Sequence, residues 1–389
     1  MLTGLKILYH AIVELDVPDG HAIHTREICT ALAHAGHEIT LAAPRAAGPP
    51  VVNGLTNLPL RFHGYGGFRL RLYRRLARRQ LEERIARERP DVIVDKASPL
   101  LSELATIAER LAVPLVVELN GVFERSGSAF ERQTFAGLRR AAATGRLRLL
   151  GVSPRVGEVL EQQVGLTGIP FQRFENGANV ELFHDTPPRR RSRSELGVED
   201  SKFLLGFLGA DNPQYDFAAM LAGLRAAVAN GVDAIALFAG SPALHRRIAQ
   251  IAEQLGIAHR VRLHSRLPYE DVAATLRALD AGFVLWRPEV DHMAPTALKL
   301  KELLLCGVPV ICDVPDSWYA WPLADAVHRV EDHQPESIGS VIEEIAADAH
   351  AARTRAARGR DIVIELYSWP SVGGRYGRVL ADWCQRKPS

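Results

Sequence analysis

The stretch that decides the fold is LKILYHAIVELDVPDGHAIHTREICTALAHAGHEITLAAP, residues 5–44. Its first part, residues 5–13, is mostly apolar, as is typical of a parallel strand buried on both faces. A loop that includes Gly20 follows, and apolar residues then recur at helical spacing until Gly36 ends the helix. Residues 38–44 form a second apolar run. The order strand, helix, strand predicts an α/β unit with a parallel sheet.

The same alternation continues along the chain. Further strands are expected at residues 91–97, 114–120, 147–153, 202–210, 234–240, 260–267, 281–288, 308–314 and 326–330. Residues 179–198 contain two prolines and an arginine run with little apolar periodicity, so they predict an interdomain linker. The fold class is therefore α/β, with two Rossmann-like, doubly wound domains at residues 1–178 and 199–367. The amphipathic residues 368–389 predict a terminal helix, which either lies on the surface or crosses back to the first domain.

The composition is that of a packed globular protein of two-domain length. The chain has 389 residues, of which 47% are hydrophobic and 24% are charged. Lys and Arg total 47 against 45 Asp and Glu, and this near-neutral balance argues against a nucleic-acid-binding protein. The four cysteines form no CxxC pair, which argues against a zinc site or a disulfide framework.

Signals for membrane insertion and export are missing from the sequence. No run of about 18 apolar residues occurs. The N-terminal segment lacks the basic and long apolar regions of a signal peptide. Together with the cysteine usage, this predicts a cytoplasmic protein.

The segment that carries the most chemistry is PTALKLKELLLCGVPVICD, residues 295–313. Thr296 can cap a helix that Gly307 ends, and Lys299 and Glu302 then share one helix face. The N–H groups and partial positive charge of a helix N-terminus suit a phosphate. A carboxylate one turn later can accept hydrogen bonds from two adjacent hydroxyls, as on a ribose. The spacing fits equally well with a surface Lys–Glu pair worth about 0.3–0.5 kcal/mol.

Three glycines follow predicted strands. Gly20 lies after the first strand, and Gly209 and Gly240 follow the first two strands of the second domain. Ligands of open α/β sheets bind beyond the carboxyl ends of the strands, where glycine lets backbone N–H groups approach a phosphate, although each of these glycines also suits an ordinary turn. Neither GxGxxG nor GxxxxGK[ST] follows a strand, which argues against a dehydrogenase and a P-loop protein.

A basic helix is predicted between Arg69 and Arg89. Residues 61–90 hold ten arginines and three glutamates, with apolar residues at helical spacing. A solvated arginine-rich face is the simpler interpretation. The functional alternative is a peripheral contact with an anionic membrane or a charged acceptor.

Several titratable side chains near predicted strand ends are candidates for a general base. They include His21, His24 and Glu118. The sequence does not choose among them, because such residues also serve in turns and helix caps. No Ser-His-Asp order, HExxH motif or DxD-type metal signature is present, so we expect neither a metal site nor a cofactor.

The chain resembles the retaining GT-B glycosyltransferases of glycosyltransferase family 4 over nearly its whole length. The most specific resemblance is between residues 295–313 and the family pattern P-T-K-L-x-E-Y-x-A-x-G-x-P-V-I. The matching positions are Lys299, Glu302, Gly307, Pro309 and Val310. Residues 149–165 and 171–183 resemble the family's Val-Ser strand end and Asn-Gly hinge. The resemblance implies two Rossmann-like domains facing across a cleft, with the C-terminal helix crossing back to the N-terminal domain.

The resemblance also implies a sugar-nucleotide donor site, mostly on the second domain. Glu302 would hold the ribose hydroxyls, and Lys299 would face the diphosphate and assist catalysis. The other implied donor contacts are the backbone of Thr296 and Ala297, the backbone near Arg266 and Leu267 at the nucleobase, Gly209, Gly240, and Gly20 from the first domain. The family's usual course is retention by front-face attack, assisted by the leaving phosphate and independent of a metal.

The sequence departs from the family at three places. Ala294 stands where the family often has a glutamate. The segment GADNPQYD, residues 209–216, lacks the usual arginine and lysine, so phosphate binding would depend more on Lys299 and backbone groups. Asn120 replaces a family histidine and could still hydrogen-bond to sugar or phosphate as a catalytic group.

The expected function is transfer of a hexosyl or N-acetylhexosaminyl group from a nucleoside-diphosphate donor, UDP-sugar favoured. The acceptor would be a hydroxyl of a lipid-linked glycan, a polysaccharide or a small natural product. One alternative is a non-catalytic partner subunit that binds sugar nucleotides, suggested by Ala294 and the missing basic pair. Another is an inverting GT-B transferase with His21 or His24 as base.

Overall fold

The computed structural model contains two compact units. It describes residues 4–15, 20–44, 53–60, 67–120, 128–185, 191–288, 298–313 and 321–385. The first unit consists of Met1–Gly177 and Trp369–Ser389, and the second of Ala178–Ser368. Residues 179–198, the expected linker, are part of the second unit, where Phe183 and Leu196 are buried. Each unit is built on one parallel sheet, so the predicted α/β class is confirmed.

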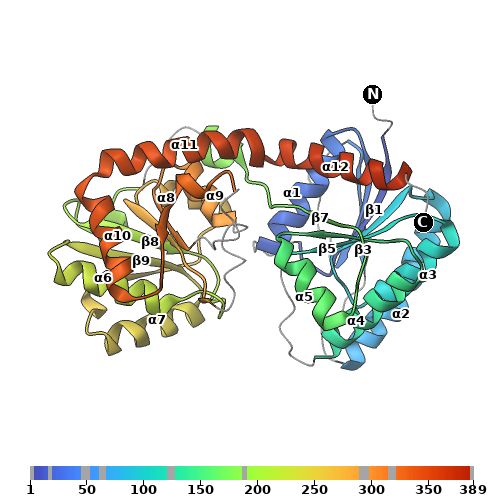
Figure 1. The fold of residues 1–389 in the computed structure, drawn as a ribbon, viewed down its shortest axis with the longest axis horizontal. Coiled ribbons are helices and arrows are strands. Elements are labelled where there is room, and N and C mark those ends of the chain that lie inside the picture. The colour runs from blue at the N-terminus through green and yellow to red at the C-terminus, as the bar shows by residue number, and fades with distance from the viewer. Residues whose placement is uncertain are drawn as a thin grey trace. The chain divides into compact units, whose positions relative to one another are not determined.

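The first unit has a seven-stranded parallel sheet in the order β3-β2-β1-β4-β5-β6-β7, with helices on both faces (Figure 1). The strands are β1 (Lys6–His10), β2 (Glu38–Pro44), β3 (Leu55–Leu60), β4 (Val92–Asp95), β5 (Leu115–Leu119), β6 (Leu147–Gly151) and β7 (Phe171–Arg173). The two edge strands, β3 and β7, were not expected. β3 carries Asn57 and Pro59, which weaken a strand pattern, and β7 has three residues.

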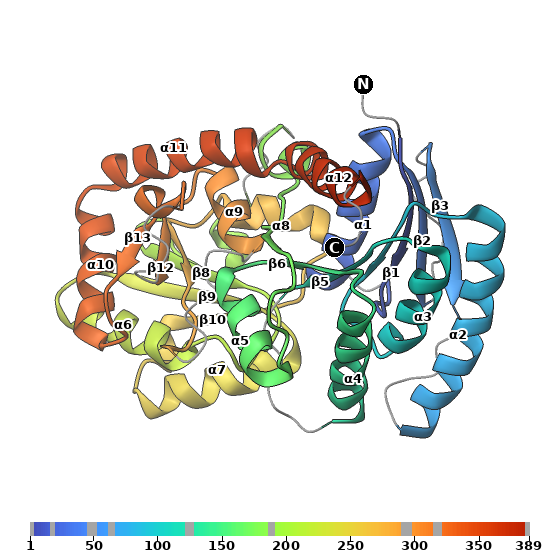
Figure 2. The same ribbon diagram turned by 45° about the vertical axis from the view of Figure 1, so that its right-hand side comes forward.

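The helices of the first unit include the returning C-terminal helix. They are α1 (Gly20–His34), α2 (Gly67–Glu88), α3 (Leu101–Leu111), α4 (Ala129–Ala143), α5 (Pro154–Val164) and α12 (Trp369–Gln385). α12 packs along α1 (Figure 2), which confirms the expected crossover. The two helices approach closely because Gly373 faces Ala31, where a Cβ would lie 2.6 Å from the Ala31 Cβ. Gly20, expected in the loop, is instead the first residue of α1.

The second unit has a six-stranded parallel sheet in the order β10-β9-β8-β11-β12-β13. The strands are β8 (Phe203–Leu208), β9 (Ala234–Gly240), β10 (Val261–Ser265), β11 (Ala281–Val284), β12 (Val310–Asp313) and β13 (His328–Val330). Each strand range expected from the sequence contains an observed strand. The orders 3-2-1-4-5-6 and 10-9-8-11-12-13 place a topological switch at β1/β4 and at β8/β11, the pattern of a doubly wound sheet.

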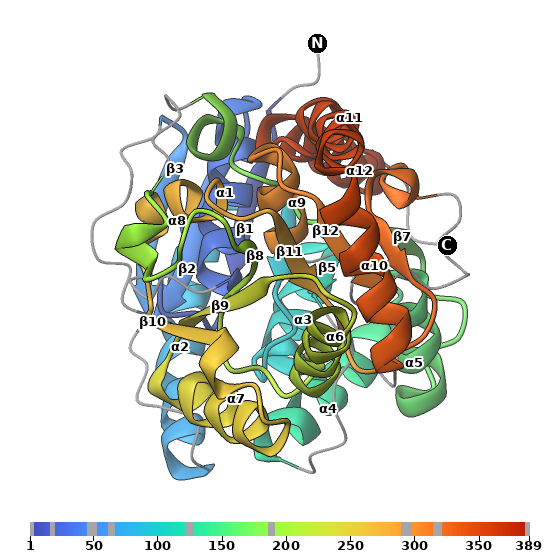
Figure 3. The same ribbon diagram turned by 90° about the vertical axis from the view of Figure 1, so that its left-hand side faces the viewer.

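Helices flank the second sheet on both faces. They are α6 (Phe217–Ala229), α7 (Pro242–Gln254), α8 (Tyr269–Leu276), α9 (Leu298–Leu305), α10 (Pro335–Ala347) and α11 (Ala349–Tyr367). α6 and α10 lie side by side (Figure 3), with Gly223 of α6 against Ile338 of α10. α9 is followed by Gly307 at φ +69°, as the sequence predicts. Among the described helices, none combines the length and apolar character that a membrane span needs.

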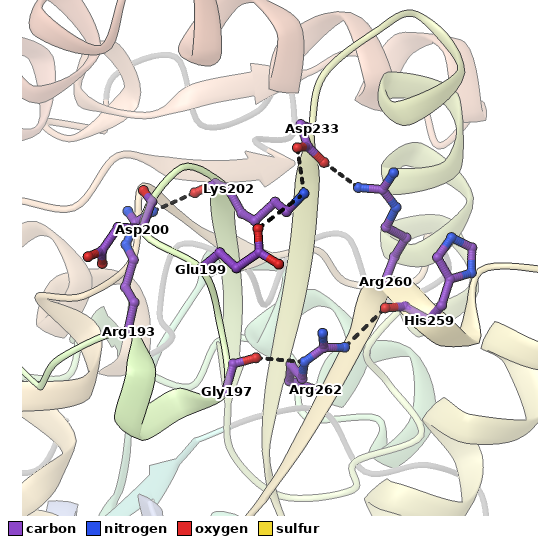
Figure 4. A network of polar contacts seen from close by, with 9 residues as sticks. All are labelled: Arg193, Gly197, Glu199, Asp200, Lys202, Asp233, His259, Arg260 and Arg262. Atoms are coloured by element: carbon purple, nitrogen blue, oxygen red, sulfur yellow. Dashed lines mark hydrogen bonds and ion pairs between the residues drawn. The ribbon is translucent and has the colours of Figure 1, made fainter.

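A polar network joins the amino ends of three strands of the second sheet (Figure 4). Asp233 accepts hydrogen bonds from Lys202 at 2.6 Å and from Arg260 at 2.5 Å. Arg262 donates to the Gly197 carbonyl at 2.9 Å. These residues precede or begin β8, β9 and β10. Their charged groups therefore bind one another at the amino edge of the sheet, opposite the carboxyl ends of the strands.

Candidate functional site

The carboxyl edge of the second sheet gathers several of the predicted donor residues. Gly209 follows β8 and hydrogen-bonds to β9. Gly240 ends β9 and pairs in register with Ser265, the last residue of β10. The loop from β10 to α8 begins directly after Ser265 with Arg266, which is exposed, and Leu267. The structure therefore places these predicted contacts along one edge, where parallel sheets bind ligands.

Lys299 extends from α9 to this edge, and its amine lies on two aromatic rings. The Nζ atom is 3.7 Å from the centre of the Phe207 ring and 4.0 Å from the centre of the Tyr215 ring. A Cβ on Gly209 would come within 2.6 Å of the same Nζ. Within the described part of the chain, no carboxylate lies at ion-pair distance from the amine. Among the described residues, the amine is thus held by aromatic rings and not by an ion pair.

Glu302 lies one turn after Lys299 and is 8% exposed. Its Oε1 atom accepts a hydrogen bond from the Tyr269 hydroxyl at 3.0 Å. Burial raises the pKa of Glu302 to about 7, although the Tyr269 bond and Lys299 act against this rise. Burial likewise lowers the pKa of Lys299 to about 7, with Glu302 opposing it. Both side chains therefore change charge near neutral pH, as is typical of functional sites.

The aromatic residues of this site were missed in the sequence analysis. Phe207 and Tyr215 lie on either side of Gly209, in the run GFLGADNPQY, and Tyr269 follows the loop at Leu267. Aromatic residues in this fold usually belong to the core, so neither periodicity nor spacing distinguishes them. Only the position of the Lys299 side chain in the folded unit shows that two of these rings face a lysine.

In the first unit, Glu118 is at the centre of a buried polar cluster. Its carboxylate accepts hydrogen bonds from Tyr9 at 2.8 Å and from Tyr376 at 3.0 Å. The His24 Nε2 atom lies 2.6 Å from it, and the Lys96 amine lies 3.9 Å away. Burial alone would raise the pKa of Glu118, but His24, Lys96 and Tyr9 hold it well below its usual range. Both carboxylate oxygens thus lie against polar groups of the protein.

The other predicted residues of the first unit are divided between the surface and the core. Gly20 and the exposed His21 open α1, where the Thr25 hydroxyl already bonds to the His21 carbonyl. His24, one turn later, is 2% exposed, and burial lowers its pKa. Asn120 follows β5 and is half-buried. Of these residues, the structure brings His24 and Glu118 into direct contact.

Three residues named in the sequence analysis lie outside the described part of the chain. They are Ala294, Thr296 and Ala297. The expected cap and backbone contacts at the start of α9 therefore stay predictions.

Comparison with known proteins agrees with this architecture. Residues 18–182 match the model of Glycosyltransferase Family 4. No curated protein matches the sequence. Solved structures match over nearly the whole length, at low sequence identity. They include sucrose-phosphate synthase from Thermosynechococcus elongatus (17% identity, TM-score 0.72, 97% of this chain and 98% of that chain), HepE from Anabaena in complex with UDP (15%, 0.70, 97% and 100%) and the catalytic domain of starch synthase IV from Arabidopsis thaliana bound to ADP and acarbose (14%, 0.73, 99% and 100%).

The two parallel sheets and these structural matches define a protein with the GT-B fold. Residues 18–182 are, in addition, similar to Glycosyltransferase Family 4.

Proposed function

We propose that this protein transfers a sugar from a nucleoside-diphosphate donor, with a UDP-sugar favoured, to an acceptor hydroxyl with retention of configuration. The observation that carries the proposal is the Lys299 amine, held over two rings beside Gly209 with the Glu302 carboxyl one turn away. An amine that has no ion-pair partner among the described residues suits a diphosphate. A buried carboxylate that already accepts a hydroxyl suits a ribose. The transferred group would be a hexosyl or N-acetylhexosaminyl group.

In the proposed mechanism, the second unit stabilises the leaving group. As the bond from the anomeric carbon to the diphosphate breaks, negative charge develops on the phosphate oxygen, and a preorganised cation stabilises that charge. Lys299 would supply this charge, together with backbone N–H groups at Thr296 and Ala297. The backbone at Arg266 and Leu267 would contact the nucleobase. We propose that these groups serve in place of a metal ion.

Structures of two similar proteins contain nucleotides that support this class of donor. HepE was solved with UDP and with UDP-glucose, and starch synthase IV was solved with ADP. The test is thermal stabilisation of the purified protein by UDP-, GDP-, dTDP- and ADP-sugars, with NAD(H) as the control. We expect stabilisation by UDP-sugars and none by NAD(H). A shift with NAD(H) alone, or no sugar-nucleotide turnover with any acceptor class, would contradict the proposal.

The stereochemical course has its own test. Proton NMR coupling constants of the product report its anomeric configuration. Retention is expected, because the His24 imidazole is buried against Glu118 and is not placed as a solvent-accessible base. A product of inverted configuration would favour the inverting alternative, with the exposed His21 as the base to test first.

We expect Glu302→Gln to weaken uridine binding by about 10- to 100-fold, because a charge-assisted hydrogen bond contributes about 1.5–3 kcal/mol. Uridine lacks phosphate, so calorimetry with uridine isolates the ribose contact from Lys299. The wild-type affinity should rise with pH through about 7, where the Glu302 carboxyl ionises, and the variant should show no such rise. The exposed Glu331→Gln serves as the control. Equal uridine affinity in both variants would refute the ribose assignment.

Gly209→Ala is expected to displace the Lys299 amine with little loss of stability. The new Cβ would lie 2.6 Å from Nζ, and a flexible side-chain end can move away. UDP affinity should fall about tenfold, uridine affinity should stay unchanged, and the unfolding free energy should stay within about 1 kcal/mol of wild type. Gly374→Ala, whose Cβ would meet only Arg378 at 3.7 Å, is the matched control. Unchanged UDP affinity would show that the space beside Gly209 does not determine how Lys299 binds the diphosphate.

We propose that the N-terminal half of α2 makes a peripheral contact with an anionic surface on the acceptor side. Along the helix, four arginines are paired with glutamates: Arg74 with Glu103, Arg78 with Glu82, Arg79 with Glu83, and Arg84 with Glu88. Phe68 is 79% exposed, and Arg69, Arg71 and Arg75 are exposed as well. An aromatic side chain beside basic residues is typical of an interfacial helix.

Vesicle sedimentation tests this contact. Alanine at Arg69, Arg71 and Arg75 together should abolish binding to vesicles with anionic lipid, since each arginine near the surface contributes about 1 kcal/mol. The double variant Arg78→Ala/Arg79→Ala removes exposed but paired arginines and should bind nearly as wild type. Equal loss in both variants would indicate general charge attraction instead of this surface.

A further inference from the structure

We propose that Phe207 and Tyr215 form an aromatic seat that positions the Lys299 amine for a diphosphate group. The segment at residues 209–216 has no basic residue of its own. The seat instead holds the positive charge of Lys299 beside this segment. The identity of the ligand rests on the proposed function, whereas the seat itself rests on the geometry of the second unit alone. Phe207 and Tyr215 act through Lys299, so they are positioning residues.

The geometry of the amine defines the seat. Two ring centres lie 3.7 Å and 4.0 Å from the Lys299 Nζ, well inside the roughly 6 Å range of a cation–π contact. The missing side chain of Gly209 leaves the third side open for the amine. The rings attract the cation without neutralising it, whereas a carboxylate partner would compete with an incoming anion. The protonated amine can therefore pair with an anionic ligand.

The two rings are fixed by the core of the second unit. Phe207 is 1% exposed and meets Tyr215 edge to face, with ring centres 4.9 Å apart. Tyr215 stacks on Trp286 at 4.3 Å, and the two residues also pair as an antiparallel bridge. The backbone N–H of Trp286 in turn donates to the Asp313 carboxylate at 3.2 Å. The seat is therefore a rigid part of the fold, so it can preorganise a flexible lysine.

The charges around residues 209–216 are consistent with Lys299 as the cation and the two rings as its positioning residues. The segment GADNPQYD contains Asp211 and Asp216 but no basic residue. Arg247, which reaches it from α7, is ion-paired with Asp211 at 3.0 Å. Asp216 is hydrogen-bonded to His333 at 2.8 Å. These charges are paired with one another, and the segment acts on the Lys299 amine through the ring of Tyr215.

The first experiment measures UDP and uridine binding by calorimetry for wild type, Tyr215→Phe, Tyr215→Leu and Lys299→Met. Tyr215→Phe keeps the ring and should bind UDP within about twofold of wild type. Tyr215→Leu removes the ring and should weaken UDP binding about tenfold, with uridine affinity unchanged. Equal UDP affinity in all three Tyr215 forms would overturn the proposal.

A double variant shows whether Tyr215 acts through the lysine. In the Lys299→Met background, Tyr215→Leu should cause no further loss of UDP affinity, because the cation that the ring positions is already absent. A full additional tenfold loss would mean that the ring contacts the ligand itself or supports the fold, and it would reject the positioning role. Far-UV circular dichroism and melting temperatures establish that each variant is folded.

A second measurement examines the seat without any nucleotide. Competitive acetylation, read by mass spectrometry as a function of pH, reports the reactivity of the Lys299 amine relative to Lys202, which is ion-paired at the opposite edge of the sheet. Tyr215→Leu should change the relative reactivity of Lys299 severalfold, and Tyr215→Phe should not. No change in either variant would refute the seat. A change without UDP binding by wild type would support the seat and reject the proposed donor.

Discussion

Replacing Lys299 with methionine is expected to lower kcat by about 100- to 1000-fold, with a much smaller change in donor KM. Methionine keeps the length of the side chain over the rings of Phe207 and Tyr215 but removes the charge. Charge accumulates on the leaving diphosphate as the glycosidic bond breaks, so the interaction is stronger in the transition state than in the ground state. Loss of one preorganised donor for such charge costs about 10²–10³ in kcat.

The pH profile gives an independent check on the same residue. The Lys299 amine is protonated below about pH 7, and the Glu302 carboxyl is ionised above about pH 7. Donor kcat/KM of the wild type should therefore pass through a narrow maximum near neutrality, set by the apparent pKa values of the pair. Lys299→Met should lose the alkaline limb, and Glu302→Gln the acid limb. A variant with unaltered kinetics and a lowered melting temperature would instead indicate a structural role for the lysine.

Replacing Glu118 with alanine is expected to lower the unfolding free energy of the first unit by about 3–5 kcal/mol. The substitution removes the acceptor of two buried tyrosine hydroxyls, Tyr9 and Tyr376, the partner of the His24 imidazole and the counter-charge of Lys96. Breaking a buried ionic cluster by deleting one member leaves the others desolvated and unpaired, which costs about this amount. The cluster joins β1, β5, α1 and α12, so the loss should spread across the whole unit.

Peptide-resolved hydrogen exchange measures this loss in the first unit alone, which a two-domain unfolding curve does not do. Exchange should accelerate in β5 and α12 of Glu118→Ala and stay unchanged in β8 and β9. The exposed Glu161→Ala is the control. Because the pKa of Glu118 lies below its unfolded value, its contribution is present above about pH 4.5 and is lost as the pH falls further. Unchanged exchange in Glu118→Ala would contradict the assignment of a structural centre.

The surroundings of His24 and Glu118 could not be predicted from the sequence. The sequence offers His24 and Glu118 as candidate bases because they lie near predicted strand ends. In the structure, the His24 Nε2 atom lies 2.6 Å from the Glu118 carboxylate. Their positions on β5 and α1 are visible in the sequence, but their partners are not. Tyr376 comes from the far end of the chain, so only the return of α12 shows that Glu118 accepts a hydrogen bond from it.

The local pattern of apolar runs, glycine stops and turns was enough to predict the α/β alternation, the parallel sheets and the helix that carries Lys299 and Glu302. This works because burial on both faces of a parallel strand leaves a continuous apolar run, and because helix ends need particular residues. The edge strands β3 and β7 were missed because an edge strand is half-solvated and its sequence carries a weaker signal.

The chemistry of the site depended on contacts between distant segments. Lys299 and Glu302 are neighbours in sequence, but the rings beneath the lysine come from Phe207 and Tyr215, more than 80 residues earlier. Sequence spacing therefore identified which charges share a helix face, since that is a local property of the helix. The partners and the pKa values of those charges follow from desolvation and ring contact at the sheet edge, and these arise only when α9 packs against β11 and β12 and Lys299 reaches the rings of Phe207 and Tyr215.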